Sequence, residues 1–196
     1  AFERRGSNNT LEIFLMNPDG SGLLNLTQNS VDDVNPSWSP DGKSLVFHSY
    51  REDNLDLYRL EVDDGRVTRL TFDSAVDWYP SWSPEGRYIA FYSNRRERDY
   101  DIYLLNLSNL DEVIPVTSID GADAQPTWSP DGRQIVFQRH INGNWEIFVI
   151  SIDGSGMANL TNHPADDKTP AFSPDGTKIA FMSERTGNPE IFVLDL

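Results

Sequence analysis

The sequence repeats one short motif, Pro-x-(Trp/Phe)-Ser-Pro-(Asp/Glu)-Gly, four times. The prolines that open the four copies lie 44, 46 and 44 residues apart. A repeat of this length constrains the fold strongly, because each copy is one structural unit that must bury its apolar face against its neighbours. The copies begin at Pro36, Pro80, Pro126 and Pro170.

Each copy predicts four short strands joined by turns. Ser-Pro-Asp-Gly is typical of a tight turn, because proline presets φ and glycine accepts a backbone conformation that other residues resist. An apolar run such as Leu45-Val46-Phe47 follows, and then an acid before residues with strand propensity, as in Asp56-Leu57-Tyr58. We therefore predict an all-β fold, a β-propeller of four-stranded antiparallel blades. A β-sandwich is the alternative, but it does not require turns that repeat residue for residue.

Five modules are visible, of which the first lacks its opening strand and the last ends before its fourth strand. We expect a single domain over residues 1–196, with blades at about 1–32, 33–76, 77–122, 123–166 and 167–196. Ala1 and Phe2 fall inside a predicted strand, so we expect a fragment of a longer chain. We expect a five-bladed ring with an imperfect seam. The alternatives are part of a six-bladed ring and closure by a second copy, which would give a strand-exchanged dimer instead of a monomer.

These motifs resemble the TolB-like β-propeller repeat, a WD-like repeat, over essentially the whole chain. The same family pattern includes Ser-x-Arg, present at Ser49-Tyr50-Arg51, Ser93-Asn94-Arg95 and Ser183-Glu184-Arg185 and broken at Arg139-His140. The resemblance implies a periplasmic or secreted bacterial protein that presents a rigid disc to another protein. Similar blades also occur in prolyl oligopeptidase-type peptidases and in oligogalacturonate-type polysaccharide lyases, so the motif is far more specific for fold than for function.

The charge narrows the choice of partners. The chain has 16 Lys and Arg against 31 Asp and Glu, a net charge of −15. Such a surface repels phosphate backbones and anionic lipid, so we expect no nucleic acid partner and no membrane insertion. A protein or peptide partner with basic character fits better. There is no cysteine, which excludes disulfides and thiol chemistry.

An aspartate lies three residues before each repeat proline, always in the same register. If the strand that carries the tryptophan is innermost, alternation places Asp33 with Asn35 and Ser37 and predicts a ring of carboxylates at one mouth of the channel. That ring could bind a hard cation such as calcium or receive a basic partner. The favoured alternative is that each carboxylate accepts backbone N–H bonds from a neighbouring loop, with no cofactor. The four are Asp33, Asp77, Asp123 and Asp167.

Three aromatic residues interrupt the repeat. Trp78, Tyr79 and Trp145 stand where other modules carry small or polar residues, and we interpret them as partner-binding candidates or as packing within their own loops. The histidines occupy unrelated module positions, and no nucleophile elbow or phosphate loop is present, so we predict no catalytic residue. We predict cross-strand ion pairs between the Ser-x-Arg arginines and the acids that open the third strands.

Two functions remain open from the sequence. The first is a non-catalytic protein-interaction module. The second is the propeller portion of a hydrolase, peptidase or polysaccharide lyase whose catalytic residues lie elsewhere or in the channel.

Overall fold

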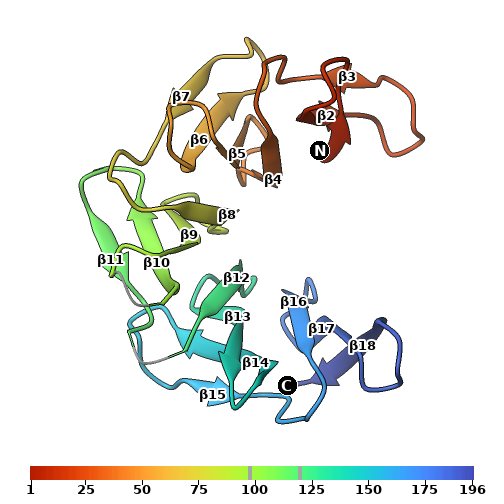
Figure 1. Cartoon of the computed structure of the whole chain (residues 1–196), viewed down its shortest axis with the longest axis vertical. Helices are drawn as coiled ribbons and strands as arrows, with labels where there is room; N and C mark the ends of the chain where they lie inside the picture. Colours follow the sequence, from red (N-terminus) through yellow and green to blue (C-terminus); the bar gives the residue numbers. More distant parts are fainter. Residues whose placement is uncertain (97–98, 119–120) are drawn as a thin grey trace.

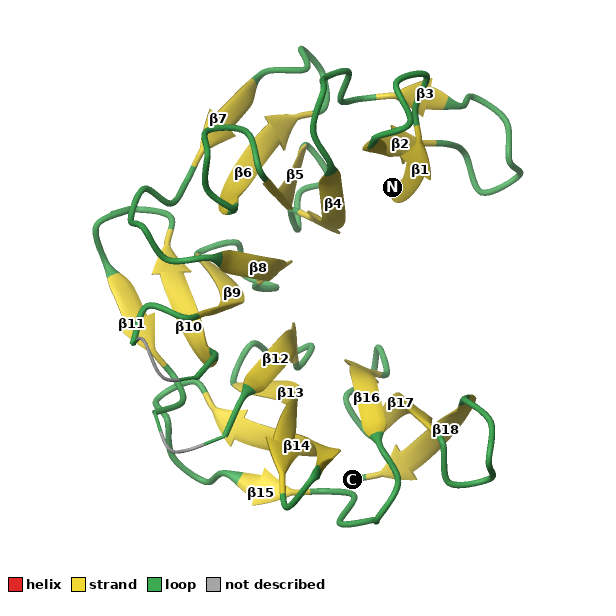
Figure 2. Cartoon of the chain, in the orientation of Figure 1, coloured by secondary structure: helices red, strands yellow, loops and turns green. Residues whose placement is uncertain are grey.

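The chain folds into five small antiparallel sheets that follow one another along the sequence (Figures 1 and 2). The computed structural model describes residues 1–96, 99–118 and 121–196, and no helix occurs in those ranges. It follows that none of the segments described there is a helix that could cross a membrane. The all-β prediction and the five-bladed count are confirmed.

Each sheet consists of consecutive strands. The first contains β1 (Phe2–Arg5), β2 (Leu11–Leu15) and β3 (Leu24–Asn25). The second contains β4 (Asp33–Trp38), β5 (Ser44–Ser49), β6 (Asp56–Glu61) and β7 (Val67–Arg69). The third contains β8 (Asp77–Trp82), β9 (Tyr88–Ser93), β10 (Asp101–Asn106) and β11 (Val113–Pro115). The fourth contains β12 (Asp123–Trp128), β13 (Gln134–Ile141), β14 (Asn144–Ser151) and β15 (Ala158–Asn159), and the fifth β16 (Asp167–Phe172), β17 (Lys178–Ser183) and β18 (Glu190–Asp195).

The sheets are arranged around a shared axis, with β4, β8, β12 and β16 innermost (Figure 1). Neighbouring inner strands contact one another in the order β4, β8, β12 and β16. Figure 1 shows a gap between the first and fifth sheets, where the expected imperfect seam of the five-bladed ring lies.

The core lies between the sheets. The repeat phenylalanines Phe47, Phe91 and Phe137 are fully buried, as expected of flat sheets that stack face to face. Trp82 and Trp128 are also buried, and Nε1 of Trp128 donates a hydrogen bond to the carbonyl of Ser81 in the preceding sheet. Trp38 differs from Trp82 and Trp128. It is 38% exposed, because the sheet before it has no inner strand to cover it.

The face of the fifth sheet that carries Ile191 and Val193 of β18 is exposed. Ile191 and Val193 are 72% and 62% exposed, whereas Ile147, which corresponds to Ile191 in the fourth sheet, is fully buried. The following sheet covers that position in the earlier blades. The choice between monomer and strand-exchanged dimer stays a prediction.

Every complete inner strand contains a β-bulge at the residue before the repeat proline. In the second sheet, Val34 pairs with His48 and Ser37 with Val46, so two residues lie opposite Phe47 alone. The residue before the proline has a positive φ in all four strands, which is uncommon for residues other than glycine. These four bulge residues are Asn35 (54°), Tyr79 (48°), Gln125 (53°) and Thr169 (53°).

Candidate functional site

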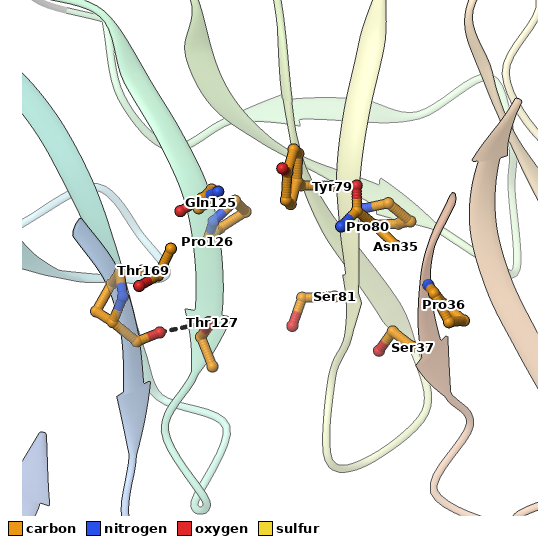
Figure 3. Close-up of a pocket in the computed structure, with 11 residues that line it drawn as sticks. Asn35, Pro36, Ser37, Tyr79, Pro80, Ser81, Gln125, Pro126, Thr127 and Thr169 are labelled. Atoms are coloured by element: carbon orange, nitrogen blue, oxygen red, sulfur yellow. Dashed lines mark hydrogen bonds between the residues drawn. The ribbon is translucent and has the colours of Figure 1, made fainter. Parts of the chain in front are cut away.

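The bulges form the mouth of the central channel (Figure 3). A cavity of about 310 Å³ opens there, walled by the same three positions of successive inner strands. Small polar side chains two residues after the bulges, such as Ser37, Ser81 and Thr127, gather around one opening. We call this cavity the channel mouth; its lining is Asn35, Pro36, Ser37, Tyr79, Pro80, Ser81, Gln125, Pro126, Thr127, Thr169 and Pro170.

Three of the four bulges are tied to the preceding sheet by a hydrogen bond. The bulge N–H donates to the side chain that directly follows the repeat phenylalanine in that sheet. This bond satisfies a backbone donor that the bulge removes from the strand ladder. The bonds join Asn35 to Oε1 of Glu3 (2.5 Å), Tyr79 to Nδ1 of His48 (3.3 Å) and Thr169 to Oε1 of Gln138 (3.0 Å).

The seam between the third and fourth sheets lacks this bond. The residue after the repeat phenylalanine is Tyr92 there, and within the described ranges no side chain accepts from the N–H of Gln125. Oε1 of Gln125 is also buried without a hydrogen-bond donor. The seam between the third and fourth sheets is therefore built differently from the other three.

A second cavity, of about 440 Å³, occupies this seam. We call it the seam cavity. Tyr79 and Gln125 border both it and the channel mouth. All three aromatic candidates predicted from the sequence line it, so the fold brings together residues that are 67 positions apart. Its lining is Trp78, Tyr79, Tyr92, Tyr100, Ala122, Asp123, Ala124, Gln125, Gln138 and Trp145.

The aromatic side of the seam cavity is centred on Tyr92. Its ring stacks on Trp78 and Tyr79, with centroids 6.3 and 5.7 Å away, and meets Tyr100 edge-on at 5.5 Å. Burial raises the pKa of the Tyr92 phenol. The indole nitrogen of Trp78 is buried without an acceptor. These rings therefore form a rigid wall that is uncharged at neutral pH.

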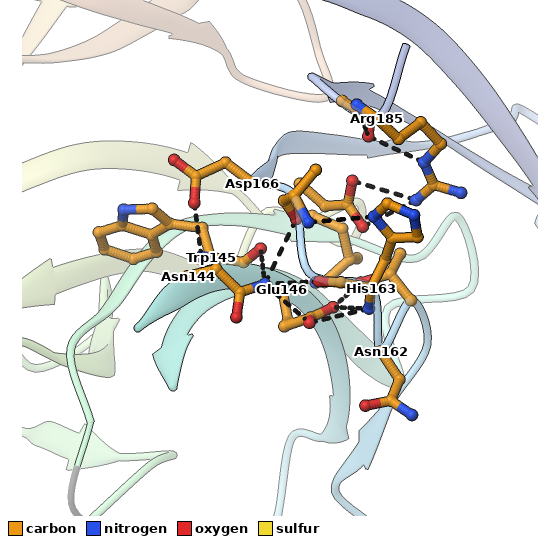
Figure 4. A network of polar contacts seen from close by, with 12 residues as sticks. Asn144, Trp145, Glu146, Asn162, His163, Asp166 and Arg185 are labelled. Carbon is orange, nitrogen blue, oxygen red and sulfur yellow. Dashed lines mark hydrogen bonds and ion pairs between the residues drawn. The ribbon is translucent and has the colours of Figure 1, made fainter. Parts of the chain in front are cut away.

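Trp145 reaches the seam cavity from an extended hairpin. Asn142 and Gly143, both with positive φ, form a two-residue turn that lets β13 and β14 pair out to Ile141 and Asn144. A polar network holds the hairpin from behind, while the indole of Trp145 points away from that network (Figure 4). The network includes Trp145 N–H to Oδ1 of Asp166 (3.0 Å), Asn144 Nδ2 to the carbonyl of His163 (2.7 Å) and His163 N–H to Oε1 of Glu146 (2.9 Å).

The four repeated aspartates do not form a ring in the channel, which corrects the predicted position. All four are fully buried, and each forms an ion pair with an arginine of its own sheet. The bulge explains the error, because one extra residue between Asp33 and Ser37 breaks the alternation on which the prediction relied. The pairs are Asp33–Arg51, Asp77–Arg95, Asp123–Arg139 and Asp167–Arg185.

These pairs also correct the predicted partners of the Ser-x-Arg arginines. Arg51 binds Asp33 through two hydrogen bonds and lies over the rings of Phe47 and Tyr58. Asp56 is paired with Arg69 instead. Burial raises the pKa of Asp77 and Asp123, and their arginine partners oppose the shift. The favoured alternative is not observed either: among the described residues the donors to these four carboxylates are side chains, and an arginine is the donor common to all four.

Arg139 replaces the Ser-x-Arg arginine in the fourth sheet. It occupies the position of the serine, directly opposite Asp123 in the strand pairing, as Ser93 is opposite Asp77. Its Nε and Nη2 reach the two carboxylate oxygens at 2.5 and 2.6 Å. The loop between β13 and β14 therefore needs no arginine to pair with Asp123, which is compatible with the short turn next to Trp145.

We expect calcium to leave the protein unchanged. Since each repeated carboxylate already has a guanidinium partner, none has a free charge to offer a shared ion. Adding calcium or a chelator should shift the thermal midpoint by less than about 1 °C in scanning calorimetry. A rise of several degrees that the chelator reverses would contradict this expectation.

Titratable side chains elsewhere are dispersed. Within the part of the chain that is described, no group of three or more His, Asp or Glu has a geometry suited to a metal ion. His48 is buried against Trp78 and Tyr79, whereas His140 lies against Trp145 in the hairpin of β13 and β14.

Sequence reasoning missed six residues of the seam cavity, of which four have aromatic or polar side chains. Tyr92 and Gln138 follow the repeat phenylalanine, a position where the modules differ most, and this variation was the available signal. Tyr100 precedes the third strand, and Gln125 precedes the proline. Neither position is unusual unless the bulge is known.

Comparison with known proteins places these features in a family. The family model described as the TolB beta propeller domain matches residues 2–102 and 77–196. No curated protein gives a significant match. Among solved structures, TolB from Acinetobacter baumannii is 25% identical with a TM-score of 0.84, over 95% of this chain and 46% of that one. The present chain thus spans about half the length of that relative.

Enzymes share the architecture. An oligogalacturonate lyase in complex with manganese is 17% identical with a TM-score of 0.74, over 97% of this chain and 55% of that one. A puromycin-hydrolyzing peptidase from Mycobacterium tuberculosis is 14% identical with the same TM-score, over 95% of this chain and 31% of that one. At these identities the likeness concerns the fold alone.

Proposed function

Because the chain belongs to the TolB β-propeller family, we propose that it is a non-catalytic module that binds a basic segment of a protein partner at the channel mouth. The observation that carries this proposal is the channel mouth itself, where four strained bulges hold small polar side chains around one opening. Backbone conformations of this kind cost free energy and persist where the surrounding structure enforces them, often at binding sites.

The charge of the chain gives the partner its character. A net charge of −15 attracts cationic segments and raises their encounter rate, an effect that salt weakens. A periplasmic or secreted location and the absence of catalysis belong to this proposal. The alternative is a propeller that covers or carries the active site of a peptidase or lyase, which the shared fold keeps open.

Short capped peptides of equal length test the proposal. One is lysine-rich, one glutamine-rich and one glutamate-rich, and tryptophan fluorescence reports binding. We expect the lysine-rich peptide to bind at least about tenfold more tightly than the others, with an affinity that falls as salt rises. Ser81→Phe should obstruct the channel mouth and weaken peptide binding by a similar factor. Phe72→Ala replaces an exposed side chain that does not line the channel mouth, and it should leave peptide binding unchanged.

Two results would overturn the proposal. One is equal binding of the three peptides, or binding that Ser81→Phe does not alter. The other is turnover of peptide or polygalacturonate by this chain, measured by product release, which would favour the enzymatic alternative.

A further inference from the structure

We propose that the seam cavity is a second binding site, adjoining the channel mouth, and that it receives one arginine side chain of a protein partner. The inference rests on the proposed role as a protein-binding module. It assigns a ligand chemistry to a different cavity, lined by the five aromatic residues Trp78, Tyr79, Tyr92, Tyr100 and Trp145.

The first argument is the comparison of the four seams. Three are closed by the hydrogen bond between a bulge N–H and the preceding sheet. In the remaining seam Tyr92 provides no such bond, and a cavity is present instead. Because the same repeat closes its other seams, the open one reflects particular residues of this seam, and above all Tyr92.

The second argument is the unsatisfied amide of Gln125. Its Oε1 is buried at the cavity wall and has no donor among the residues that the structure describes. A buried acceptor without a partner costs about 1–3 kcal/mol, so a donor that entered the cavity would recover free energy. The ligand should therefore carry N–H or O–H groups.

The third argument is the charge of the wall. In the described structure, no lysine, arginine or histidine lines the cavity, and Asp123 is its one ionisable carboxyl. Aromatic faces carry negative electrostatic potential and attract cations. An anionic ligand finds no counter-charge here, whereas a cation is favoured by the rings, by the amide oxygen and by the net charge of the chain.

Arginine fits these features better than lysine. Its planar guanidinium stacks on aromatic faces and offers five donors, so it can meet the Tyr and Trp rings and Oε1 of Gln125 together. The same chemistry already occurs in this fold, where Arg95 lies over Phe91 and Tyr103 at 5.1 and 4.9 Å.

The test uses one capped pentapeptide with a central arginine and its isosteric counterpart with citrulline, which lacks the charge. Binding is followed by the indole N–H signals of Trp78 and Trp145 in NMR spectra, assigned with Trp→Phe variants. We expect the citrulline peptide to bind at least about fivefold more weakly, consistent with a desolvated cation–aromatic contact. The two indole signals should shift on addition of the arginine peptide.

Two substitutions at Gln125 give opposite expectations. Gln125→Leu removes the acceptor and should weaken arginine binding about threefold or more. Gln125→Glu adds a carboxylate and should strengthen it by a similar factor, with no gain for citrulline. Phe72→Ala is the matched control for loss of an exposed aromatic ring and should change neither affinity.

Equal binding of arginine and citrulline, shifts at indoles outside the seam cavity, or weaker binding after Gln125→Glu would each overturn this inference. Its failure is distinct from failure of the proposed function. If the lysine-rich peptide still binds and Ser81→Phe still blocks it, the channel proposal stands while the seam site is rejected.

Discussion

His48→Gln should remove the destabilisation that protonation of the unfolded chain at His48 causes between about pH 6.5 and about pH 4. His48 is 1% exposed, and burial lowers its pKa from 6.5 to about 4. In this range the unfolded chain binds a proton on His48 and the folded chain does not. The free energy of unfolding therefore falls as the pH falls from 6.5 and levels off below about 4.

The expected size follows from the shift. A difference of roughly 2.5 pKa units corresponds to about 3 kcal/mol at acid pH. Glutamine is the natural replacement, because Gln138 at the same module position accepts the N–H of Thr169. His48→Gln should keep the bond to Tyr79 and lose only part of the ring packing, which costs about 1 kcal/mol at every pH.

Urea unfolding of both proteins, followed by tryptophan fluorescence across this pH range, measures the difference. The comparison of the two proteins is needed because protonation of Asp56 changes the free energy of unfolding in the opposite direction. Burial raises its pKa to about 6, so its protonation favours the folded state as the pH falls. That contribution is common to both proteins and cancels.

His140→Gln is the matched control for the substitution itself, because it replaces an exposed histidine by the same residue. His48→Leu separates the two roles of the ring. It should also remove the destabilisation at acid pH that His48 causes, but lower stability by about 1–3 kcal/mol at all pH values, because the N–H of Tyr79 loses its acceptor. A His48→Gln protein with the wild-type slope would contradict the assignment.

The strands and the aromatic residues show what the sequence could and could not predict. The strands were predictable because turn chemistry and apolar runs are local and occur in every module. Trp78, Tyr79 and Trp145 stood out because they break the repeat, and the fold places them in one cavity. That the rings meet across a seam could not be read from spacing alone.

The bulge was not predictable for a physical reason. Tyr79, Gln125 and Thr169 adopt positive φ although none of them is a residue type that favours it. Tertiary contacts such as the bond from Tyr79 to His48 impose the conformation. Once the bulge is missed, alternation assigns the aspartates to the wrong side, and the arginine partners are missed as well.

Arg139→Ser should be the most damaging of the arginine substitutions. It leaves the fully buried Asp123 without its guanidinium, and removing one partner of a buried pair costs about 3–5 kcal/mol. Arg51→Ser is the matched comparison. The side chain of Arg51 is 23% exposed against 2% for Arg139, so water can reach the carboxylate it leaves, and we expect a loss of about 1–2 kcal/mol.

The repeat itself supplies the rescue. In three sheets an arginine 18 residues after the aspartate makes the pair, with serine opposite the aspartate. Arg139→Ser combined with Ile141→Arg rebuilds that arrangement in the fourth sheet and should recover about half of the lost stability, measured by urea unfolding. The same double variant should disturb the hairpin that carries Trp145, because Ile141 pairs with Asn144 beside the turn. A stable double variant with weakened arginine binding would therefore show that Arg139 keeps the loop short enough for Trp145 to reach the seam cavity. Equal losses for Arg139→Ser and Arg51→Ser would instead mean that burial does not set the strength of these pairs.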